Sequence, residues 1–257
     1  MVDMTIDPRT AAIKKNLEKF DAFVAVMSSK GGVGKTFSVA VLAYILANNY
    51  DVTVSLLDMD LTNPTLHMVL GLDMKSVKIE EEKGIKPFKV SAKTELMTMA
   101  YFVQESSIPL RGKEIENAVR EILSITKWNG DILLVDMPPG FSDSHLEFLR
   151  LFTLSKTLII LITTPQLLAL KSVEKLANSL LQERAPIAGI MGNMCMDMSE
   201  TEKIRKMATQ LNLDYLGCIP YIADIESYYG SRLTEIIHRI EPSIKRAVEV
   251  IAKRGKR

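Results

Sequence analysis

The sequence predicts an α/β protein with a doubly wound, mostly parallel sheet flanked by helices. Strands and helical stretches alternate along most of the chain, and the strands are apolar throughout, as in KTLIILIT at 156–163. A strand that is covered on both faces lacks polar alternation, and strands separated by helices pair in parallel. A third observation is the glycine-rich loop between the strand at 22–28 and the helix that follows it.

The expected elements follow one another along a single domain of residues 1–257. An N-terminal helix lies within 1–20, with Asp7 as its cap and Pro8 as its first residue. The expected strands lie at 22–28, 52–58, 95–101, 131–136, 156–163, 185–193 and 213–220. The expected helices lie at 35–48, 113–127, 143–154, 166–183 and 199–211, with a basic C-terminal helix and tail at 232–257. A charged run at 78–84 is expected to be a surface loop.

Composition argues against several classes of protein. Lysine and arginine number 32 against 31 aspartates and glutamates, so the net charge of +1 lacks the basic excess of a nucleic-acid-binding protein. Two cysteines, Cys195 and Cys218, make no disulfide framework, which favours a reducing cytosol. The N-terminus has no apolar signal core, and no apolar run reaches the ~20 residues of a membrane span. We therefore expect a cytoplasmic protein.

A phosphate-binding loop is predicted at SSKGGVGKT, residues 28–36. It follows a strand and opens a helix, which is the context in which such loops cradle phosphates. Lys35 is expected to contact the β- and γ-phosphates, and Thr36 to offer its hydroxyl to Mg²⁺. A glycine-rich turn without a ligand is the alternative. The predicted nucleotide-binding residues of the loop are Gly31, Gly32, Val33, Gly34, Lys35, Thr36 and Phe37.

The loop departs from the common phosphate-loop pattern at two positions. Ser29 stands where the pattern has glycine, and Lys30 adds a second lysine. The remaining K-G-G-V-G-K-T resembles the deviant loop of the MinD/ParA/Mrp ATPases. This resemblance implies that Lys30 reaches the nucleotide of a second subunit, so that the active form is a homodimer with ATP sandwiched between the subunits. A partner's cation would stabilise charge on the transferred phosphoryl group. The alternative for Lys30 is a solvated surface lysine.

Three aspartates follow predicted strands. Asp58 and Asp60, in LLDMD, share one face of the chain, and Asp136 ends the strand ILLVD. Ligands of a parallel sheet bind beyond the carboxyl ends of its strands, so the three carboxylates are expected near the phosphates. The resemblance implies that Asp60 positions the attacking water, Asp58 supports the Mg²⁺ shell and Asp136 holds Mg²⁺. Capping of the strand end is the alternative for Asp58 and Asp60.

Further stretches resemble the Mrp-type ATPases, which include eukaryotic cytosolic cluster scaffolds. These stretches are DMPPGFSDSHL at 136–146, IPLRGKEIENAVREIL at 108–123, TTPQLLALKSVEKLANSL at 163–180, GNM at 192–194 and LGCIP at 216–220. The resemblance implies that Asn193 hydrogen-bonds adenine and that Pro220 packs on it; a turn residue is the alternative for Asn193. No Asn-Lys-x-Asp signature for guanine is present, so ATP is favoured. Ser142 or Asp143 is expected to cap a helix, in preference to a hydrolytic triad.

One departure from the cluster-carrying members concerns cysteine. These members have a Cys-x-x-Cys pair after Asn-Met, whereas NMCMDMSETEK at 193–203 has only Cys195. A [4Fe–4S] cluster needs four thiolates, which makes an iron–sulfur cluster doubtful here. Cys218 is expected to be a small core residue, and Cys195 to be inert. A labile cluster or soft metal, bound by two Cys195 thiolates with weak help from nearby methionines, is the alternative.

The C-terminal residues combine an apolar stripe from Leu233 to Ile251 with a basic tail. Such a helix usually caps a core; binding to a membrane or to DNA is the alternative. The favoured function is that of a dimeric ATPase switch of Mrp/MinD type that binds Mg·ATP and hydrolyses it slowly, as a relative of iron–sulfur cluster carriers. The alternatives are a MinD/ParA-like positioning or regulatory ATPase on membrane or DNA, and a small-molecule kinase or ligase. The sequence names no client.

Overall fold

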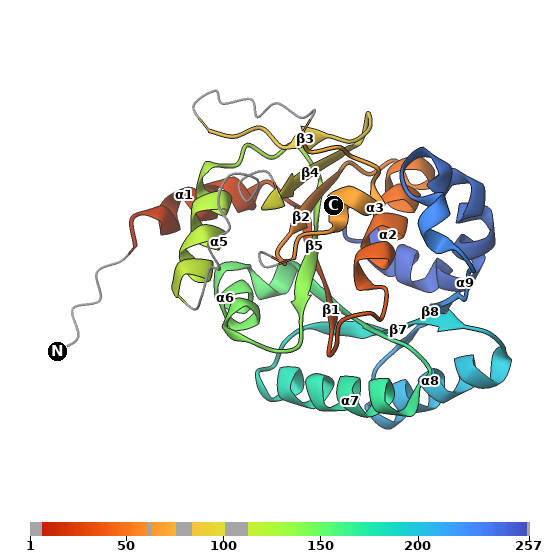
Figure 1. The fold of residues 1–257 in the computed structure, drawn as a ribbon. Helices are drawn as coiled ribbons and strands as arrows, with labels where there is room; N and C mark the ends of the chain where they lie inside the picture. The colour runs from red at the N-terminus through yellow and green to blue at the C-terminus, as the bar shows by residue number, and fades with distance from the viewer. Residues whose placement is uncertain (1–6, 61–62, 76–83, 101–112, 256–257) are drawn as a thin grey trace.

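An eight-stranded sheet lies at the centre of the computed structural model, which describes residues 7–60, 63–75, 84–100 and 113–255 (Figure 1). The strand order is β3-β4-β2-β5-β1-β6-β7-β8, and only β3 runs antiparallel to its neighbour. The strands are β1 (Ala22–Ser28), β2 (Val54–Asp58), β3 (Phe88–Lys89), β4 (Thr94–Thr98), β5 (Ile132–Pro139), β6 (Thr157–Thr163), β7 (Ile187–Cys195) and β8 (Tyr215–Pro220). The predicted doubly wound, mostly parallel architecture is confirmed.

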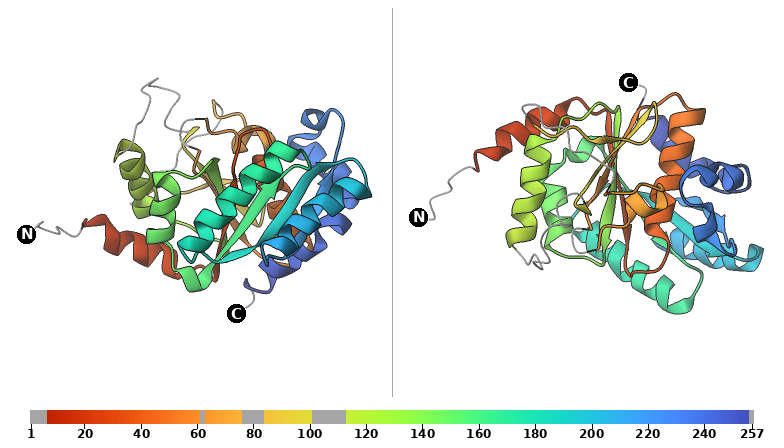
Figure 2. Two further views of the ribbon diagram at one scale, coloured as in Figure 1. Left: turned by 90° about the horizontal axis from the view of Figure 1, so that it is seen from below. Right: turned by 45° about the horizontal axis from the view of Figure 1, so that its top comes forward.

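Helices cover both faces of the sheet (Figure 2). Helices α2, α3 and α9 pack on one face, and α1, α5, α6, α7 and α8 on the other. The helices are α1 (Arg9–Glu18), α2 (Lys35–Asn49), α3 (Leu66–Val69), α5 (Lys113–Ile125), α6 (Asp143–Leu151), α7 (Leu167–Gln182), α8 (Met198–Gln210) and α9 (Thr234–Ala252), with 3₁₀ turns at Leu154–Lys156, Ile225–Tyr228 and Gly230–Leu233. The strands in the middle of the sheet, such as β1, β5 and β6, are therefore buried on both sides.

The central strand β1 shows how this pattern is used. Val24 and Val26 face the core under α2 and α9, whereas Phe23, Ala25 and Met27 face the core under α6 and α7. All five side chains are buried. β1 lies between β5 and β6 in the middle of the sheet. From there the chain connections run to one side of the sheet before β5 and to the other side after it, so the loop after β1 lies at the point where the strand order reverses. That point is the usual ligand-binding crevice of a doubly wound sheet.

The apolar stripe of the C-terminal helix α9 is part of the core. Ile240, Ile244 and Val248 are buried, and the helix packs against α2 and β8. Pro242 interrupts the helix, and the backbone of Ile244 is non-helical, because a proline within a helix removes a hydrogen bond and crowds the preceding turn. The stripe is thus covered by the protein itself.

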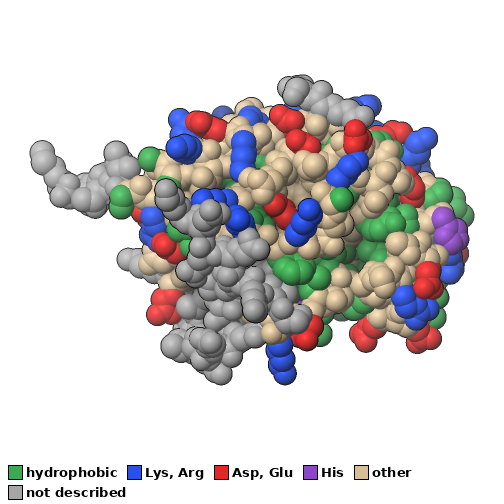
Figure 3. Space-filling model, turned by 90° about the horizontal axis from the view of Figure 1, so that it is seen from above, with side chains coloured by type: hydrophobic (Ala, Val, Ile, Leu, Met, Phe, Trp, Pro, Cys, Tyr) green, Lys and Arg blue, Asp and Glu red, His purple; other side chains and the backbone are tan. Residues whose placement is uncertain are grey.

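Two basic residues of this helix have acidic partners. Lys245 lies 3.8 Å from the Glu249 carboxylate, and Arg246 lies 2.9 Å from that of Asp214. On the face seen in Figure 3, acidic and basic side chains are likewise interspersed. Among the helices of the described ranges, none is long and apolar enough to cross a membrane.

The structure corrects the expectation that the two cysteines make no disulfide. A disulfide joins Cys195 at the end of β7 to Cys218 in β8, with Cα atoms 6.4 Å apart. This distance lies within the range that disulfides span. Both residues are buried, so the expectation that Cys218 belongs to the core holds, but neither thiol is free.

Two short elements were not expected from the sequence, namely β3 and α3. The predicted strand at 131–136 continues as β5 to Pro139, and the other predicted elements differ from those observed by a few residues at their ends. Most of the predicted loop at 78–84, and the Arg-Gly sequence at 111–112, lie outside the described residues.

Candidate functional site

The glycine-rich loop connects the buried strand β1 to helix α2. Gly32 and Gly34 have φ angles of +77° and +78°, a conformation that favours glycine, and Gly34 caps the helix. A Cβ atom at Gly34 would also overlap the side-chain amide of Asn193, whereas one at Gly31 would meet no atom within 4 Å. The loop is therefore tight beside β7 and open at Gly31, where a ligand can approach the backbone.

Lys35, Thr36 and Asp136 meet at the end of this loop. The Lys35 ammonium group forms an ion pair with the Asp136 carboxylate, and the Thr36 hydroxyl donates a hydrogen bond to the same carboxylate at 2.7 Å. Lys35 and Asp136 are buried although the neighbouring Gly31 and Gly32 are exposed. The structure thus brings together the predicted phosphate-binding lysine, the predicted metal-binding hydroxyl and the carboxylate at the end of a distant strand.

Asp58 lies directly across from Asp136, because these residues are register partners in the neighbouring strands β2 and β5. Its buried carboxylate accepts hydrogen bonds from the backbone N–H groups of Asp60 (3.2 Å) and Leu66 (3.1 Å) and from the Thr98 hydroxyl (3.3 Å). Burial, and then repulsion from Asp136, raises the pKa of Asp58 to about 7. A cation placed between the two carboxylates would relieve this repulsion.

Asp60 is half-buried beside the same group. Burial raises the pKa of Asp136, and the negative charge of Asp60 adds to this effect, whereas Lys35 and Thr36 oppose it. The Asp60 carboxylate accepts a hydrogen bond from the Asn63 backbone at 3.2 Å. The position of the three aspartates at the carboxyl ends of their strands therefore predicted correctly that they gather at one edge of the sheet.

The donors around Asp136 fit Mg²⁺ of a nucleotide complex. Mg²⁺ binds oxygen ligands and usually takes one or two from the protein, with waters and phosphate oxygens completing its shell. Thr36 and Asp136 supply a hydroxyl and a carboxylate in contact with each other. Within the described residues, no group of three or more His, Cys, Asp or Glu side chains forms a metal site made by protein alone. The site therefore fits a cation that arrives with phosphates.

A cavity of about 430 Å³ lies beside the loop, and Phe37, Asn193 and Pro220 line it. Asn193 and Pro220 are the residues that the resemblance places at the adenine, and Phe37 is one of the predicted nucleotide-binding residues of the loop. Asn193 is buried, donates to the Val33 carbonyl at 2.9 Å and accepts from the Met194 backbone at 2.9 Å. A side-chain amide nitrogen carries two hydrogens, so one remains available to a base. The volume suits a ligand of nucleoside size.

Sequence reasoning missed other residues of this cavity. Tyr221, Ile222 and Tyr229 line it together with Asp224, whose φ angle is +50°. They follow β8 in a segment with 3₁₀ turns, and no motif marks them. Aromatic residues after the strand LGCIP are the one signal in the sequence that could have indicated them.

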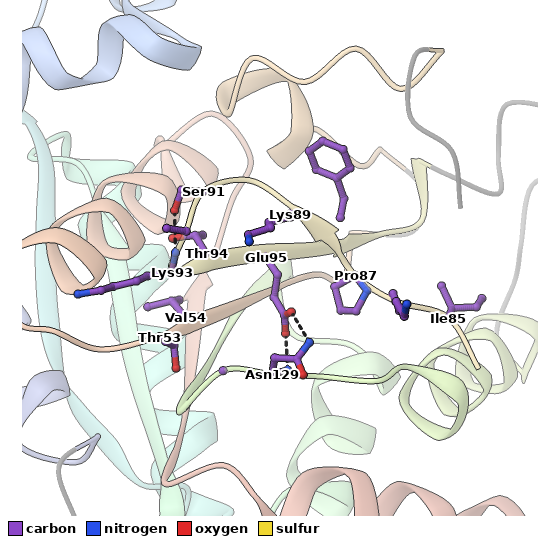
Figure 4. Close-up of a pocket in the computed structure, with 14 residues that line it drawn as sticks. Thr53, Val54, Ile85, Pro87, Lys89, Ser91, Lys93, Thr94, Glu95 and Asn129 are labelled. Atoms are coloured by element: carbon purple, nitrogen blue, oxygen red, sulfur yellow. Dashed lines mark hydrogen bonds between the residues drawn. The ribbon is translucent and has the colours of Figure 1, made fainter. Parts of the chain in front are cut away.

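A larger cavity, of about 540 Å³, lies at the opposite ends of the strands (Figure 4). The Glu95 carboxylate at its edge accepts hydrogen bonds from Ser55 (2.5 Å) and from the backbone and side chain of Asn129 (2.7 and 3.2 Å). These bonds tie β4 to the segment before β5. None of the predicted site residues lines this cavity.

Lys30 and His145 occupy contrasting positions. Lys30 is exposed, and its ammonium group forms no ion pair with the described part of the chain.

His145 is fully buried and belongs with Ser142 to a capping box at the start of α6, as expected from helix capping. Its other ring nitrogen faces the Pro138 carbonyl rather than a carboxylate, unlike the histidine of a hydrolytic triad.

Comparison with known protein families gives one match over most of the chain. Residues 19–254 match the model of a ParA-type family described as the NUBPL iron-transfer P-loop NTPase. The chain belongs to this family. The predicted relationship to MinD, ParA and Mrp proteins is thereby confirmed.

Curated relatives of this P-loop NTPase handle iron–sulfur clusters. An iron-sulfur cluster carrier protein from Methanococcus maripaludis is 29% identical over 267 residues, which cover 98% of the chain and 91% of the relative. The cytosolic Fe-S cluster assembly factor NBP35 from Kluyveromyces lactis is 31% identical over 232 residues, which cover 83% of the chain and 70% of the relative.

Solved structures support the same fold. A nucleotide-binding protein from Archaeoglobus fulgidus, in complex with ADP, is 26% identical, with a TM-score of 0.72 over 90% of this chain and 93% of the other. The cell division ATPase MinD of Pyrococcus furiosus is 19% identical, with a TM-score of 0.59 over 92% and 98%. At that identity the likeness to MinD concerns the fold alone.

Proposed function

We propose that this P-loop NTPase binds Mg·ATP, hydrolyses it slowly and acts as a switch in a homodimer. The observation that carries the proposal is the convergence of Lys35, Thr36 and Asp136 at the end of the loop, next to a cavity of nucleoside size. Phosphates on the loop and a base beside Asn193 fit a nucleoside triphosphate. The missing guanine signature favours ATP.

Binding of ATP would change the partners of Lys35. The ammonium group now neutralises Asp136, and phosphate oxygens would compete for it. Mg²⁺, held by Thr36 and Asp136, would neutralise charge on the β- and γ-phosphates. Asp58 lies behind Asp136 and would support this arrangement with its own charge. The Lys35 ammonium group could then bind the phosphates, because Mg²⁺ would neutralise the Asp136 carboxylate in its place.

Hydrolysis would need groups from both subunits. Asp60 is half-buried at the edge of the site, where its carboxylate can orient a water toward the γ-phosphate. Lys30 is exposed on the same loop and is free to reach across a dimer interface. A charge supplied in trans makes turnover depend on dimer formation, which suits a switch better than a metabolic catalyst.

The decisive test compares two lysines of one loop. Lys35→Ala should abolish binding of Mg·ATP, measured by isothermal titration calorimetry, because the phosphates lose their buried cation. Lys30→Ala, the matched control, should bind with nearly unchanged affinity in the monomer but fail to hydrolyse. Tight binding by Lys35→Ala would overturn the assignment of the loop.

A second function, transfer or assembly of iron–sulfur clusters, is favoured by membership in the iron-transfer family. Cys195 is the only cysteine near the position of the Cys-x-x-Cys pair, and its disulfide to Cys218 leaves no thiolate for iron. Iron and acid-labile sulfide should therefore be measured on protein purified without oxygen, reduced and reconstituted. A stable cluster that is lost in Cys195→Ala would make the chain a carrier; its absence would leave the nucleotide switch without a cluster as cargo.

Two observations count against the alternative of a positioning ATPase on membrane or DNA. The apolar stripe of α9 is buried, and Lys245 and Arg246 pair with acidic residues. We propose a cytoplasmic location, in line with the relatives described as cytosolic assembly factors. Co-sedimentation with anionic liposomes or DNA, with and without ATP, tests this choice: pelleting that depends on ATP would favour the alternative.

A further inference from the structure

His145 links the segment after Asp136 to helix α6. The imidazole is fully buried. Its Nε2 lies 3.1 Å from the Pro138 carbonyl oxygen, and its Nδ1 lies 3.1 Å from both the backbone nitrogen and the hydroxyl of Ser142. A carbonyl can only accept, so Nε2 carries the hydrogen, and Nδ1 accepts from the Ser142 N–H. The ring is therefore neutral and spans two fixed contacts.

The sequence after Asp136 gives this contact its importance. Pro138 and Pro139 have no backbone N–H, so neither can fasten the strand end by donating to a neighbour. The Gly140 N–H does so, with a bond of 2.8 Å to the Ser28 carbonyl at the start of the phosphate loop. The segment is thus held to the phosphate loop by Gly140 and to α6 by His145.

Histidine differs from the residues that usually complete a capping box. Glutamate or glutamine normally occupies this helical position and accepts from the backbone of the cap residue. An imidazole accepts in the same way through Nδ1 while its Nε2–H points in the opposite direction. In this chain that second group reaches Pro138, two residues beyond the carboxylate that pairs with Lys35. The capping requirement alone does not explain the contact.

We propose that His145 is a positioning residue for nucleotide hydrolysis, which makes Asp136–Gly140 and helix α6 move as one body when the phosphates change. The inference rests on the proposed ATPase function. A movement of Asp136 during turnover would pass through Pro138 and the imidazole to α6 instead of being absorbed by the loop. The reverse also holds, so a ligand that fixes α6 would restrain Asp136.

Two substitutions separate the contacts. The side-chain oxygen of asparagine can replace Nδ1 but cannot reach Pro138; the amide nitrogen of glutamine can replace Nε2 and donate to Pro138. We expect His145→Asn to lower kcat at least tenfold with nearly unchanged affinity for Mg·ATP. His145→Gln should stay within about threefold of the wild-type kcat. A role in helix capping alone would not lower kcat more in His145→Asn, which keeps the cap, than in His145→Gln, which loses it.

The outcomes distinguish the inference from the function on which it rests. Equal losses of kcat in the two variants, or an unaffected His145→Asn, would overturn the inference while wild-type turnover persists. Absence of wild-type turnover together with unimpaired Mg·ATP binding by Lys35→Ala would overturn the ATPase function itself.

A measurement on the unmodified protein covers the case in which the variants fold poorly. Hydrogen exchange should be compared with Mg·ADP and with a non-hydrolysable analogue of Mg·ATP. Protection of the amides in Gly140–Ser142 and in the first turns of α6 should change together. A change confined to the loop would overturn the inference.

Discussion

The ammonium group of Lys35 and the carboxylate of Asp136 form an ion pair in which both side chains are buried, with exposures of 8% and 2%. The pair joins the first residue of α2 to the strand β5, about a hundred residues away in the chain. Its cation is the one expected to bind phosphates, and its anion is the one expected to bind Mg²⁺. The two halves of the predicted site therefore neutralise each other.

Lys35→Ala should destabilise the protein as well as prevent binding. Removal of one partner leaves a buried charge without compensation, at a cost of about 3 kcal/mol in the free energy of unfolding. Lys35→Ala combined with Asp136→Asn should recover most of this loss and still fail to bind Mg·ATP. Urea denaturation of the wild type and both variants measures the difference. Equal stability of the wild type and Lys35→Ala would show that the pair contributes little.

Asp60→Ala should bind ATP and accumulate as a dimer. The substitution removes the group proposed to orient water but leaves Lys35, Thr36 and Asp136 in place, so the sandwich forms and is not resolved by hydrolysis. Light scattering after size exclusion, with Mg·ATP and then with Mg·ADP, should show a dimer only with ATP. Asp60→Ala combined with Lys30→Ala should stay monomeric. Turnover at the wild-type rate would remove Asp60 from the mechanism.

Gly34→Ala and Gly31→Ala should differ although both residues lie in one loop. A Cβ at Gly34 meets the Asn193 amide and forces a side chain into a φ of +78°, whereas a Cβ at Gly31 has open space. The left-handed conformation alone costs about 1–2 kcal/mol. We expect Gly34→Ala to lower the melting temperature by several degrees and to weaken binding of Mg·ATP. Gly31→Ala should melt within about a degree of the wild type; equal shifts would contradict this account.

Local patterns predicted the sheet and much of the site. Apolar strands, helical spacing and the glycine loop are properties of neighbouring residues. The position of Asp58 and Asp60 at the carboxyl end of a strand is enough to place both at one edge of the sheet. The short elements could not be predicted in this way. Strand β3 has two residues and exists because Phe88 and Lys89 pair with β4. Its sequence carries no period of its own.

The other missed features depend on register between distant strands. Cys195 and Cys218 come together because β7 and β8 are neighbours, and irregular register there places Cys195 opposite Pro220. Tyr221 and Tyr229 reach the cavity because the chain turns after β8. A motif identifies residues that are close in sequence; these contacts are set by the order of strands in the sheet.

The disulfide should be detectable and should stabilise the protein. Denatured protein, kept without reductant, should show no thiol that reacts with a chromogenic disulfide reagent, and two after reduction. The bond closes a loop with a sequence separation of 23, for which chain entropy predicts a contribution of about 3 kcal/mol. Reduction and Cys218→Ala should therefore lower the urea midpoint to a similar extent. Two reactive thiols before reduction would contradict the disulfide.

Acid should destabilise the protein partly through His145. Burial lowers the pKa of this imidazole from 6.5 to about 4 in the folded state. As pH falls below about 6.5, the unfolded chain takes up a proton that the folded chain refuses, so stability decreases until pH is near 4, by up to about 3 kcal/mol. His145→Gln removes this titration but not those of the carboxylates. The unfolding free energy of the wild type should therefore fall more steeply between pH 6.5 and pH 4.5 than that of His145→Gln. Parallel curves would mean that the folded state accepts the proton as readily as the unfolded chain, and would contradict the lowered pKa of His145.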